Sequence, residues 1–536
     1  MEQENIKLIE IKLKNKKDCK SIVMEKFKKI HNIFLKEDLE KENKFFVIIT
    51  FMIYMIIICI ACFYHEAWED ESQAWLIARD LSPLEIIKQM RFEGHSCMWH
   101  FMLLPFAKLR LPFDAIKIIS ITTALITGYL VLIKSPFNRL TKICTLFSST
   151  FLYYIPAIVR PYSLLPLLFI LISIMNSNKK KYPMAYGVIL AIMANIHVIM
   201  LPFTGMLFLY YYGERFIFER KSFDKKEKRR FYIGLVIAII GIGLMFAQAL
   251  AGYIFSLVKD VEPQHTSLEM MDIFSKKFVY YLLGIKYMIY AKKIFIIILL
   301  VLAIHAILIS QKQGFIFWVS FLFWIIVHCF VWRVILNQRI AVLFLFIFYY
   351  AWNYRYDIED NNFKRRFYRL FFILSKSVTA ILVLLFVFSI RNTYNIIKDE
   401  IKNPYSGGKE IAEYLINNAH ENSVILTNMS EYVSPIVAYT DGYNFEFYEV
   451  LGYRNFTFKN NDKLLHSEIF AFDKAIEKYK GREMYIVFKL DAIMLDDLLK
   501  FNPGIERNST LIYQSSNKCN NGVFYLWKVN SIFLNS

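Results

Sequence analysis

The chain has 536 residues, of which 56% are hydrophobic and 17% are aromatic. Apolar runs of about 20 residues recur along it, each long enough to cross a bilayer, which excludes a soluble globular protein. The net charge of +18 comes from Lys and Arg in short loops between these runs, so it indicates membrane orientation and not nucleic-acid binding. Seven scattered cysteines show no spacing typical of a disulfide framework or a zinc site.

Residues 1–44 are rich in Lys and are predicted to form a cytoplasmic N-terminal segment. The first apolar run is too long for a signal h-region and lacks a small-residue cleavage site, so we interpret it as a retained span. Eleven spans are predicted, at 45–64, 113–133, 143–159, 161–176, 183–200, 201–217, 231–256, 293–310, 314–332, 335–351 and 370–390. Two shorter apolar segments, 98–110 and 277–291, are re-entrant or interfacial helices or further spans. We therefore expect an all-α polytopic membrane bundle of about 11 to 13 transmembrane helices over residues 45–390.

Charge-poor runs indicate hairpins within this bundle. Residues 143–175 carry one charge, Arg160, and at 1.5 Å per residue they would reach about 50 Å, too long for one span. The run is predicted to break at Pro156 and at Arg160-Pro161. Basic loops flank each hairpin, which places the hairpin turns on the same outer face as the first loop. The ionisable and polar groups expected at that face are Asp70, Glu71, Glu93, His95, Arg160, Tyr162, His197, Arg333 and Arg339.

The first external loop, 65–97, contains the adjacent carboxylates Asp70 and Glu71. The residues after them follow helical spacing, so Asp70 is predicted to lie at a helix start, where the helix dipole favours acids. Ser82-Pro83-Leu84-Glu85 has the form of a capping box with Pro at the first helical position, which predicts a second short helix over 83–91. Both helices are expected along the membrane surface.

These features together resemble a known family. The chain has Asp70-Glu71 after the first span, then Ala78-Arg79-Asp80, Glu93-Gly94-His95 before the next apolar segment, and Arg160-Pro161-Tyr162. This arrangement is similar to the GT-C superfamily of integral membrane glycosyltransferases, in the branch of protein O-mannosyltransferases and aminoarabinose lipid A transferases. The resemblance covers about residues 45–350. It implies transfer of a sugar from a polyprenyl-phosphate carrier to an extracytoplasmic acceptor, with Asp70 as the catalytic aspartate.

The chain departs from the family pattern at two places. Related transferases often carry a basic residue soon after the acidic pair, where this chain has Ser72-Gln73, and a Pro-Pro or Lys-Pro pair where it has His95-Ser96. Phosphate recognition is therefore expected to be supplied differently, and the acceptor class is not carried over from the family.

The residues themselves allow an inverting transfer. Asp70 is the expected general base, and Glu71 is either the alternative base or an orienting partner. Arg160, Arg333, Arg339 and His95 are candidates for binding the leaving phosphate, because guanidinium groups bind phosphate bidentately and stay charged. Glu93, Tyr162 and His197 complete the expected substrate-binding set. No cofactor and no metal are expected, since the carboxylates and His65 around residue 70 show no helical ligand pair facing one way.

Structural interpretations stay open for the same residues. Asp70 and Glu71 are alternatively solvated loop acids, and His197 a hydrogen-bonded interior histidine. Arg333 and Arg339 are alternatively headgroup anchors. The tryptophans Trp68, Trp75 and Trp99 are interpreted as interfacial belt residues.

Residues 391–536 differ in character from the bundle and are predicted to form an extracytoplasmic α/β domain after a turn-rich linker at 403–408. The pattern predicts helices at 409–420, 463–479 and 491–500 and strands at 423–427, 484–490, 511–514 and 523–529. The odd span count places this domain outside, where we expect it to cover the active face or to help select the acceptor. It carries no nucleophile elbow, phosphate loop or metal motif.

The leading hypothesis is therefore a multi-pass cell-membrane glycosyltransferase that uses a polyprenyl-phosphate-sugar donor. Its acceptor is a lipid, a protein or a cell-wall glycan, and no nucleic acid is involved. The alternatives are a lipid or small-molecule transporter or flippase, and a non-catalytic scaffold. Two observations count against a transporter: the sequence shows no internal repeat, and no charged residues are spread through mid-membrane as a substrate path would need.

Overall fold

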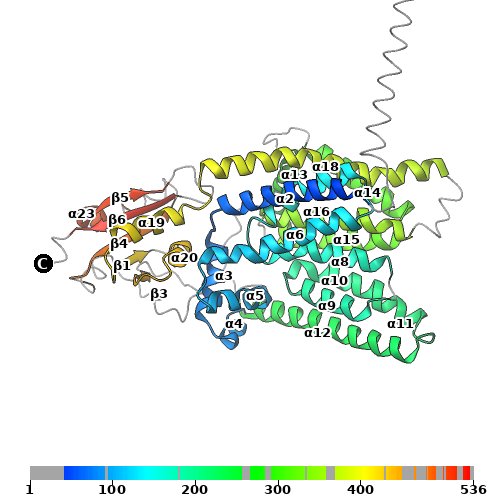
Figure 1. The fold of residues 1–536 in the computed structure, drawn as a ribbon, viewed down its shortest axis with the longest axis horizontal. Coiled ribbons are helices and arrows are strands. Elements are labelled where there is room, and N and C mark those ends of the chain that lie inside the picture. The colour runs from blue at the N-terminus through cyan, green and yellow to red at the C-terminus, as the bar shows by residue number, and fades with distance from the viewer. Residues whose placement is uncertain are drawn as a thin grey trace, which may run out of the picture.

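The structure is a computed structural model, and it describes residues 42–90, 95–178, 181–255, 266–283, 291–331, 335–357, 368–427, 430–449, 464–465, 479, 481–490, 499, 503–515 and 523–530. The molecule is elongated, with a helical bundle at one end of its long axis and a smaller sheet domain at the other (Figure 1). Three short helices lie between the two parts. The expected combination of a polytopic helical bundle with a C-terminal α/β domain is confirmed.

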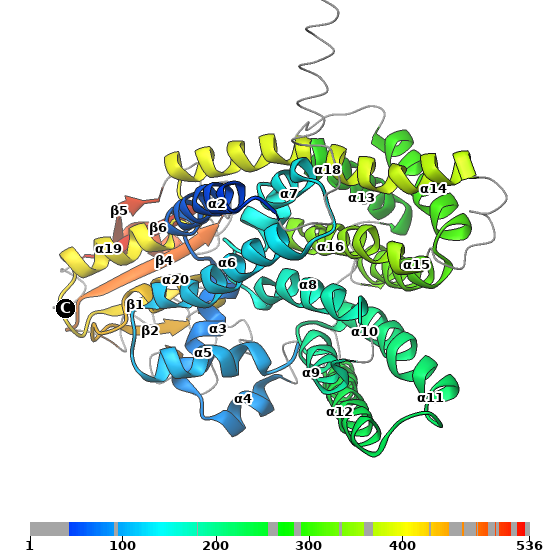
Figure 2. The same ribbon diagram turned by 45° about the vertical axis from the view of Figure 1, so that its right-hand side comes forward.

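The bundle is built from helices of different lengths that run roughly along the same axis (Figures 1 and 2). They are α2 (Lys44–Tyr64), α6 (Ile116–Lys134), α8 (Leu165–Asn176), α9 (Pro183–Ala194), α10 (Leu201–Phe208), α12 (Lys225–Phe255), α13 (Ser267–Leu283), α14 (Ala291–Leu308), α15 (Gln311–Ile325), α16 (Asn337–Asn353) and α18 (Tyr368–Lys402). In the described part of the chain, five helical stretches are long and apolar enough to cross a membrane: Lys44–Tyr64, Phe113–Lys134, Lys225–Leu250, Gln311–Val331 and Lys376–Lys402. Shorter helices such as α16, which is buried along its length, fill the interior of the bundle.

The expected span at 143–159 is not one continuous α-helix. Helix α7 (Arg139–Leu146) ends inside this range. A π-helical turn follows at Thr150–Tyr154, and irregular turns then lead to Arg160. Proline removes a backbone donor and clashes with the preceding helical turn, and Pro156 lies just after the π-helical turn. The predicted break at Arg160-Pro161 is confirmed, because a 3₁₀ turn (Pro161–Leu164) begins there and leads into α8.

Glycines allow α9 and α12 to approach each other closely. A Cβ atom on Gly187 would lie 2.1 Å from the carbonyl oxygen of Gly234, and one on Gly241 would lie 2.2 Å from the Cβ of Ala191. Small residues are typical of tightly packed membrane helices, where van der Waals contact replaces the hydrophobic effect. The pair α9–α12 is thereby fixed as one unit.

A network of neutral polar side chains joins α8, α9, α15 and α16 inside the bundle. The Asn176 amide donates to Tyr349 at 3.1 Å and to Asn353 at 2.8 Å, and it accepts from the Tyr186 hydroxyl at 3.1 Å. Tyr349 in turn donates to Gln313 at 2.9 Å. Buried polar groups that satisfy one another in this way hold membrane helices together.

Residues 69–108 contain the three helices between the bundle and the sheet domain, α3 (Glu69–Asp80), α4 (Pro83–Gln89) and α5 (Met98–Lys108). Both predicted loop helices are confirmed. So is the capping box, in which the Ser82 amide donates to Glu85 at 2.8 Å and the Glu85 amide donates to the Ser82 hydroxyl at 3.4 Å. The belt interpretation is wrong for Trp75 and Trp99, which are 1% exposed and pack inside the protein.

The C-terminal domain contains a six-stranded mixed sheet in the order β3-β2-β1-β4-β6-β5. Its elements are α19 (Gly408–Asn418), β1 (Val424–Thr427), α20 (Ser430–Tyr439), β2 (Glu446–Glu449), β3 (Leu464–Leu465), β4 (Met484–Leu490), α23 (Pro503–Asn508), β5 (Ser509–Gln514) and β6 (Val523–Val529). Strands β3, β2, β1 and β4 are parallel, and β6 runs antiparallel to β4 and β5.

The predicted helix at 409–420 and the four predicted strands are confirmed. The predicted helix at 463–479 is wrong at its start, where β3 lies, and its other residues are outside the described ones except 479. The predicted helix at 491–500 also falls outside the described residues, apart from 499.

Helix α18 extends beyond the predicted last span, which ended at residue 390. It runs for 35 residues to Lys402, about 52 Å at 1.5 Å per residue, whereas a bilayer core is about 30 Å thick. Its last turns therefore pass over the end of the bundle that bears α3. The linker at 403–408 then turns the chain into α19, with Gly407 at a φ of 71°.

The sheet domain is docked on α3 by polar contacts. The hydroxyls of Ser72 and Ser434 are 2.9 Å apart, and Arg79 forms an ion pair with Asp441 at 3.1 Å. Glu69 forms an ion pair with Lys489 on β4. The position of α3 is thus determined by the sheet domain as well as by the bundle.

Candidate active site

A polar cavity of about 190 Å³ lies at the end of the bundle that bears α3. Five separate segments of the chain contribute side chains to it: α3, the residues before α5 together with α5 itself, the turn before α8, the turn before α10, and the first turn of α16. Its lining residues are Asp70, Gln73, Ala74, Ile77, His95, His100, Arg160, His197 and Arg339. Sequence analysis placed five of these at one aqueous face: Asp70, His95, Arg160, His197 and Arg339.

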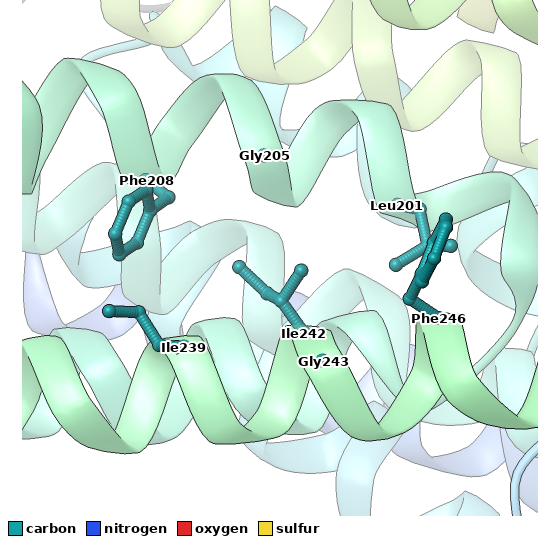
Figure 3. A pocket seen from close by; sticks show the side chains of 7 residues that line it. All are labelled: Leu201, Gly205, Phe208, Ile239, Ile242, Gly243 and Phe246. Carbon is teal, nitrogen blue, oxygen red and sulfur yellow. The ribbon is translucent and has the colours of Figure 1, made fainter.

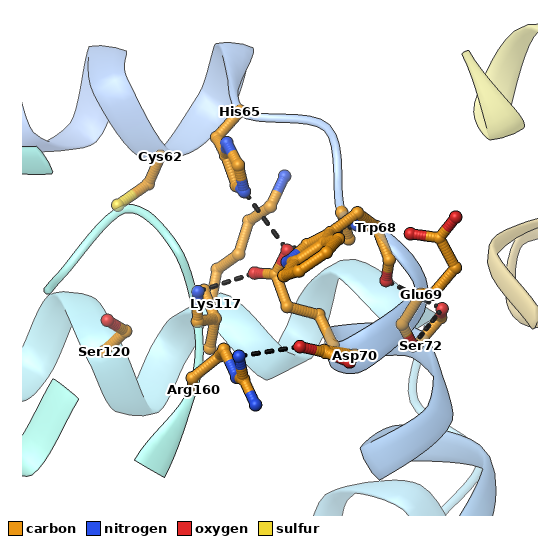
Figure 4. A network of polar contacts seen from close by, with 12 residues as sticks. Cys62, His65, Trp68, Glu69, Asp70, Ser72, Lys117, Ser120 and Arg160 are labelled. Carbon is orange, nitrogen blue, oxygen red and sulfur yellow. Dashed lines mark hydrogen bonds and ion pairs between the residues drawn. The ribbon is translucent and has the colours of Figure 1, made fainter. Parts of the chain in front are cut away.

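Asp70 and Arg160 form an ion pair in this cavity (Figure 4). The Asp70 Oδ2 and the Arg160 Nη1 are 2.6 Å apart, and the Asp70 side chain keeps 36% of its surface exposed, against 13% for Arg160. The first turn of α3 carries Asp70, where the helix dipole favours a carboxylate. The Arg160 guanidinium also lies over the rings of Trp68 and Tyr162, at 5.9 Å from each centroid. The acid is therefore reachable, and its partner is held by aromatic faces.

His197 and Arg339 reach the same cavity from two further segments of the chain. His197 precedes the 3₁₀ turn Val198–Met200, and its ring lies 5.4 Å from that of Tyr162. Arg339 is in the first turn of α16, and its main-chain carbonyl accepts a hydrogen bond from the Trp324 indole at 3.1 Å. Two guanidinium groups, those of Arg160 and Arg339, thus line one small cavity.

His95 supplies a neutral ring to the site. It stacks on His100, with ring centroids 5.5 Å apart and an interplanar angle of 17°. Burial, followed by the nearby Arg160 guanidinium, lowers the pKa of His95 to about 4. At neutral pH the imidazole is therefore uncharged and can donate one hydrogen bond and accept another.

Glu71 differs from its neighbour Asp70 in that it is fully buried. Its Oε1 accepts a hydrogen bond from the Val159 amide at 2.5 Å, and its Oε2 accepts one from the Trp68 amide at 3.2 Å. The same Oε2 lies 3.1 Å from the His65 Nε2. Both carboxylate oxygens are thus engaged inside the protein.

The structure leaves two of the expected site residues undescribed and adds others. Glu93 and Arg333 lie outside the described residues. Within the part of the chain that the structure describes, no group of three or more His, Cys, Asp or Glu side chains is placed to hold a metal ion. Gln73 and His100 line the cavity although sequence analysis did not select them. The three-residue spacing from Asp70 to Gln73 on one helix face was the available signal for the first.

The fold of this chain is similar to that of a solved structure, the crystal structure of ArnT from Cupriavidus metallidurans in the apo state. The likeness has a TM-score of 0.52 and covers 91% of this chain and 98% of that chain, at 10% sequence identity. The fold is GT-C-like. This confirms the expected GT-C-like bundle for a multi-pass membrane protein. Comparison with protein-family models and with curated protein sequences finds no match.

Proposed function

We propose that this protein is a membrane glycosyltransferase that moves a sugar from a polyprenyl-phosphate donor to an acceptor hydroxyl or amine. The observation that carries the proposal is the convergence of Asp70, Arg160 and Arg339 on one cavity. An acid beside two guanidinium groups provides both a proton acceptor and binding groups for a leaving phosphate. The GT-C-like fold supports the same reading.

The charges of the cavity suit an anionic leaving group. Asp70 and Arg160 neutralise each other, His95 is neutral, and Arg339 adds a further positive charge. A phosphate in the cavity would compete with Asp70 for the Arg160 guanidinium, because planar guanidinium groups bind phosphate oxygens bidentately. Binding of the donor would therefore release the Asp70 carboxylate for its role as base.

The proposed transfer is a single displacement. The acceptor oxygen or nitrogen attacks the anomeric carbon of the donor sugar as Asp70 takes the acceptor proton. The bond from that carbon to the phosphate oxygen breaks, and the electron pair leaves with the polyprenyl phosphate, stabilised by Arg160 and Arg339. Attack from the face opposite the leaving group inverts the anomeric centre. Glu71, with both oxygens engaged, is assigned the orienting role.

An apolar groove next to the cavity supports a lipid-linked donor. The groove has a volume of about 450 Å³ and lies between α10 and α12 (Figure 3). Its lining is entirely apolar: Leu201, Gly205, Phe208, Ile239, Ile242, Gly243 and Phe246. Leu201 of the groove follows His197 of the polar cavity by four residues in the sequence, and the 3₁₀ turn Val198–Met200 connects the two.

Two glycines of the groove are not needed for helix packing. A Cβ atom on Gly205 or Gly243 would meet nothing within 4 Å, whereas one on Gly187, Gly234 or Gly241 would collide with the facing helix. The first two glycines therefore keep space open between α10 and α12. We assign this space to the prenyl chain of the donor.

Substitution of Asp70 by Asn tests the proposal, in the purified protein with a polyprenyl-phosphate sugar as donor. The variant keeps the size of the side chain but removes the base, so turnover should fall by about 1,000-fold. Binding of the donor should be retained, because the Asp70 carboxylate then no longer competes with the phosphate for Arg160. The matched control is Asp80→Asn on the same helix, outside the cavity, which should keep its turnover.

A transporter or a scaffold would behave differently in the same experiment. Asp70→Asn would then leave donor-dependent product formation absent in both parent and variant, with any transport little changed. Turnover in Asp70→Asn at the level of the parent would also contradict the assignment of the base. The proposed orientation, with Asp70 and the sheet domain outside the cytoplasm, fails if reporter fusions place residue 70 and residue 530 in different compartments.

A further inference from the structure

A buried chain of ionisable side chains lies behind the cavity and is not part of its lining. His65 directly follows α2, and its two ring nitrogens contact two carboxylates. The Nε2 is 3.1 Å from Glu71, and the Nδ1 is 3.2 Å from Glu400 on α18. The side chains of all three residues are 0–1% exposed. The Tyr153 hydroxyl also donates to Glu400.

One end of this chain holds the backbone on both sides of the Asp70–Arg160 ion pair. Glu71 accepts from the Val159 amide, and Val159 directly precedes Arg160. It also accepts from the Trp68 amide, at the start of the helix that carries Asp70. A single carboxylate thereby fixes the two backbone segments whose side chains form the 2.6 Å pair.

The other end of the chain belongs to the junction with the sheet domain. Glu400 lies in the last turn of α18, three residues before the linker that leads to α19. Glu66, next to His65, accepts hydrogen bonds from the amides of Gly407 at 3.0 Å and Lys409 at 2.7 Å, at the start of α19. The same short segment, His65-Glu66, therefore contacts both the end of α18 and the first residues of the sheet domain.

Burying two carboxylates around one imidazole is unfavourable compared with burying apolar side chains of similar size. Well-placed apolar groups would pack the same space without that desolvation, so stability alone does not account for the arrangement. The directional contacts of His65 and Glu71 specify geometry, which apolar packing does not do to the same degree. What they specify is the position of the backbone next to Asp70 and Arg160.

We propose that His65, Glu71 and Glu400 are positioning residues that set the Asp70–Arg160 spacing when the sheet domain is seated on the bundle. The proposal rests on the proposed function for its catalytic consequence, and on the contacts above for its structural one. Glu400 supports His65, His65 orients Glu71, and Glu71 fixes the backbone at Val159 and Trp68. Glu400 does not line the cavity that contains Asp70.

The test uses the full-length protein with Glu400→Gln, which is isosteric, and Glu413→Gln as the matched control. Glu413 borders the same polar hollow at the junction as Glu400 but is exposed on α19 and lies outside the chain of contacts. We expect Glu400→Gln to lower kcat about tenfold with the donor KM changed less than twofold, since the donor-binding groups remain. Glu413→Gln should keep both constants, and Glu400→Asp should recover part of kcat.

Two further measurements separate positioning from simple damage. The hydroxyls of Ser72 and Ser434 are 2.9 Å apart. The substitutions Ser72→Cys and Ser434→Cys, combined with Glu400→Gln, should still give a disulfide, which reports a seated domain. Hydrogen exchange of the peptide containing the Val159 amide should be faster with Glu400→Gln and unchanged with Glu413→Gln. This second measurement needs no activity, so it judges the positioning chain even if the proposed transfer fails.

Several results would overturn the inference. Unchanged exchange at Val159 in Glu400→Gln would show that the contacts do not support the backbone there. Equal kcat in the parent and Glu400→Gln, or a matching loss in kcat and donor binding together with loss of the 72–434 disulfide, would reduce the chain to a structural role. If Asp70→Asn loses transfer and Glu400→Gln does not, the proposed function stands and only the positioning role is overturned.

Discussion

Two buried polar networks of this protein differ in the kind of groups that they contain. The network around Asn176 and Asn353 joins four helices of the bundle through neutral amides and hydroxyls that satisfy one another. The network of His65, Glu71 and Glu400 lies at the end next to the cavity and contains ionisable groups with two carboxylates around one ring. Both are buried to a similar degree.

We infer from this difference that the neutral network mainly stabilises the fold and that the ionisable network mainly sets the geometry of the cavity. The groups of a neutral network can all be hydrogen-bonded at a small desolvation penalty, so the network contributes to the free energy of unfolding. An ionisable network has a larger desolvation penalty. Its effect is on the positions and the pKa values of its members. Substitutions in the cavity and in the second network should therefore change rates, whereas substitutions in the first should change stability.

The largest expected effect is on the cavity itself. Arg339→Gln removes one of its two guanidinium groups while leaving the Asp70–Arg160 ion pair in place. We expect kcat/KM for the polyprenyl-phosphate sugar to fall about 100-fold, because charge on the leaving phosphate loses a preorganised donor. Arg220→Gln, in the loop after α11 (Glu214–Phe218), is the control and should keep its kcat/KM. Steady-state kinetics with a parent-like result for Arg339→Gln would contradict the assignment.

Breaking the neutral network should give the opposite pattern. Asn353→Leu removes the acceptor of the Asn176 amide and the donor to Ser173, which lies 2.7 Å away. We expect the free energy of unfolding to fall by about 1–2 kcal/mol, with kcat nearly unchanged. Equilibrium unfolding in detergent, together with the transfer assay, measures both. A strong loss of kcat at unchanged stability would erase the distinction between the two networks.

The apolar groove offers a smaller effect that depends on the substrate. Gly205→Leu and Gly243→Leu fill the open space between α10 and α12, so KM for a long-chain donor should rise about tenfold, or about 1.4 kcal/mol. Both variants should use a donor with a short, water-soluble prenyl chain as efficiently as the parent does. Gly213→Leu is the control, since its Cβ would meet only Leu209 at 3.7 Å. Equal KM values for both donors in all variants would exclude a tail in this groove.

The ionisable network also predicts a pH dependence of stability. Burial by itself lowers the pKa of His65, but Glu400 and Glu71 outweigh it and raise the pKa to about 10. The contribution to stability is therefore complete below the ordinary pKa of about 6.5 and is lost as pH rises towards 10. Between pH 7.5 and 8.5 the free energy of unfolding should therefore fall by about 1 kcal/mol. The parent should lose more stability over this interval than His65→Gln, as measured by unfolding, and parallel pH profiles would contradict it.

Much of the fold could be predicted because its signals are local. Long apolar runs, the Ser82 capping box and the short apolar runs of the sheet strands each depend on neighbouring residues, and all three were found from the sequence. The irregular turns around Pro156 were predicted only as a break, because a π-helical turn has no distinct sequence pattern. The length of α18 beyond residue 390 was missed because its last turns are polar and resemble a loop that follows a span.

The candidate site could be predicted in part for a different reason. Charged or polar residues at hairpin turns stand out in apolar sequence, which selected Asp70, Arg160, His197 and Arg339. Nothing in the sequence relates His65 to Glu400, since the two are 335 positions apart and meet only through the fold. For the same reason, the sequence left Glu71 open as a base or an orienting group, and only its contacts distinguish it from Asp70.

Helix α18 has a consequence for how the membrane itself could govern the reaction. Its stretch Lys376–Lys402 is long and apolar enough to cross a membrane, and its end presents Glu400 to His65. A helix accommodates a thinner or thicker bilayer by tilting, and tilt of a helix of this length moves its tip by several times more than its middle. We therefore expect turnover to vary with the acyl-chain length of the surrounding lipids, even when donor and acceptor are held constant.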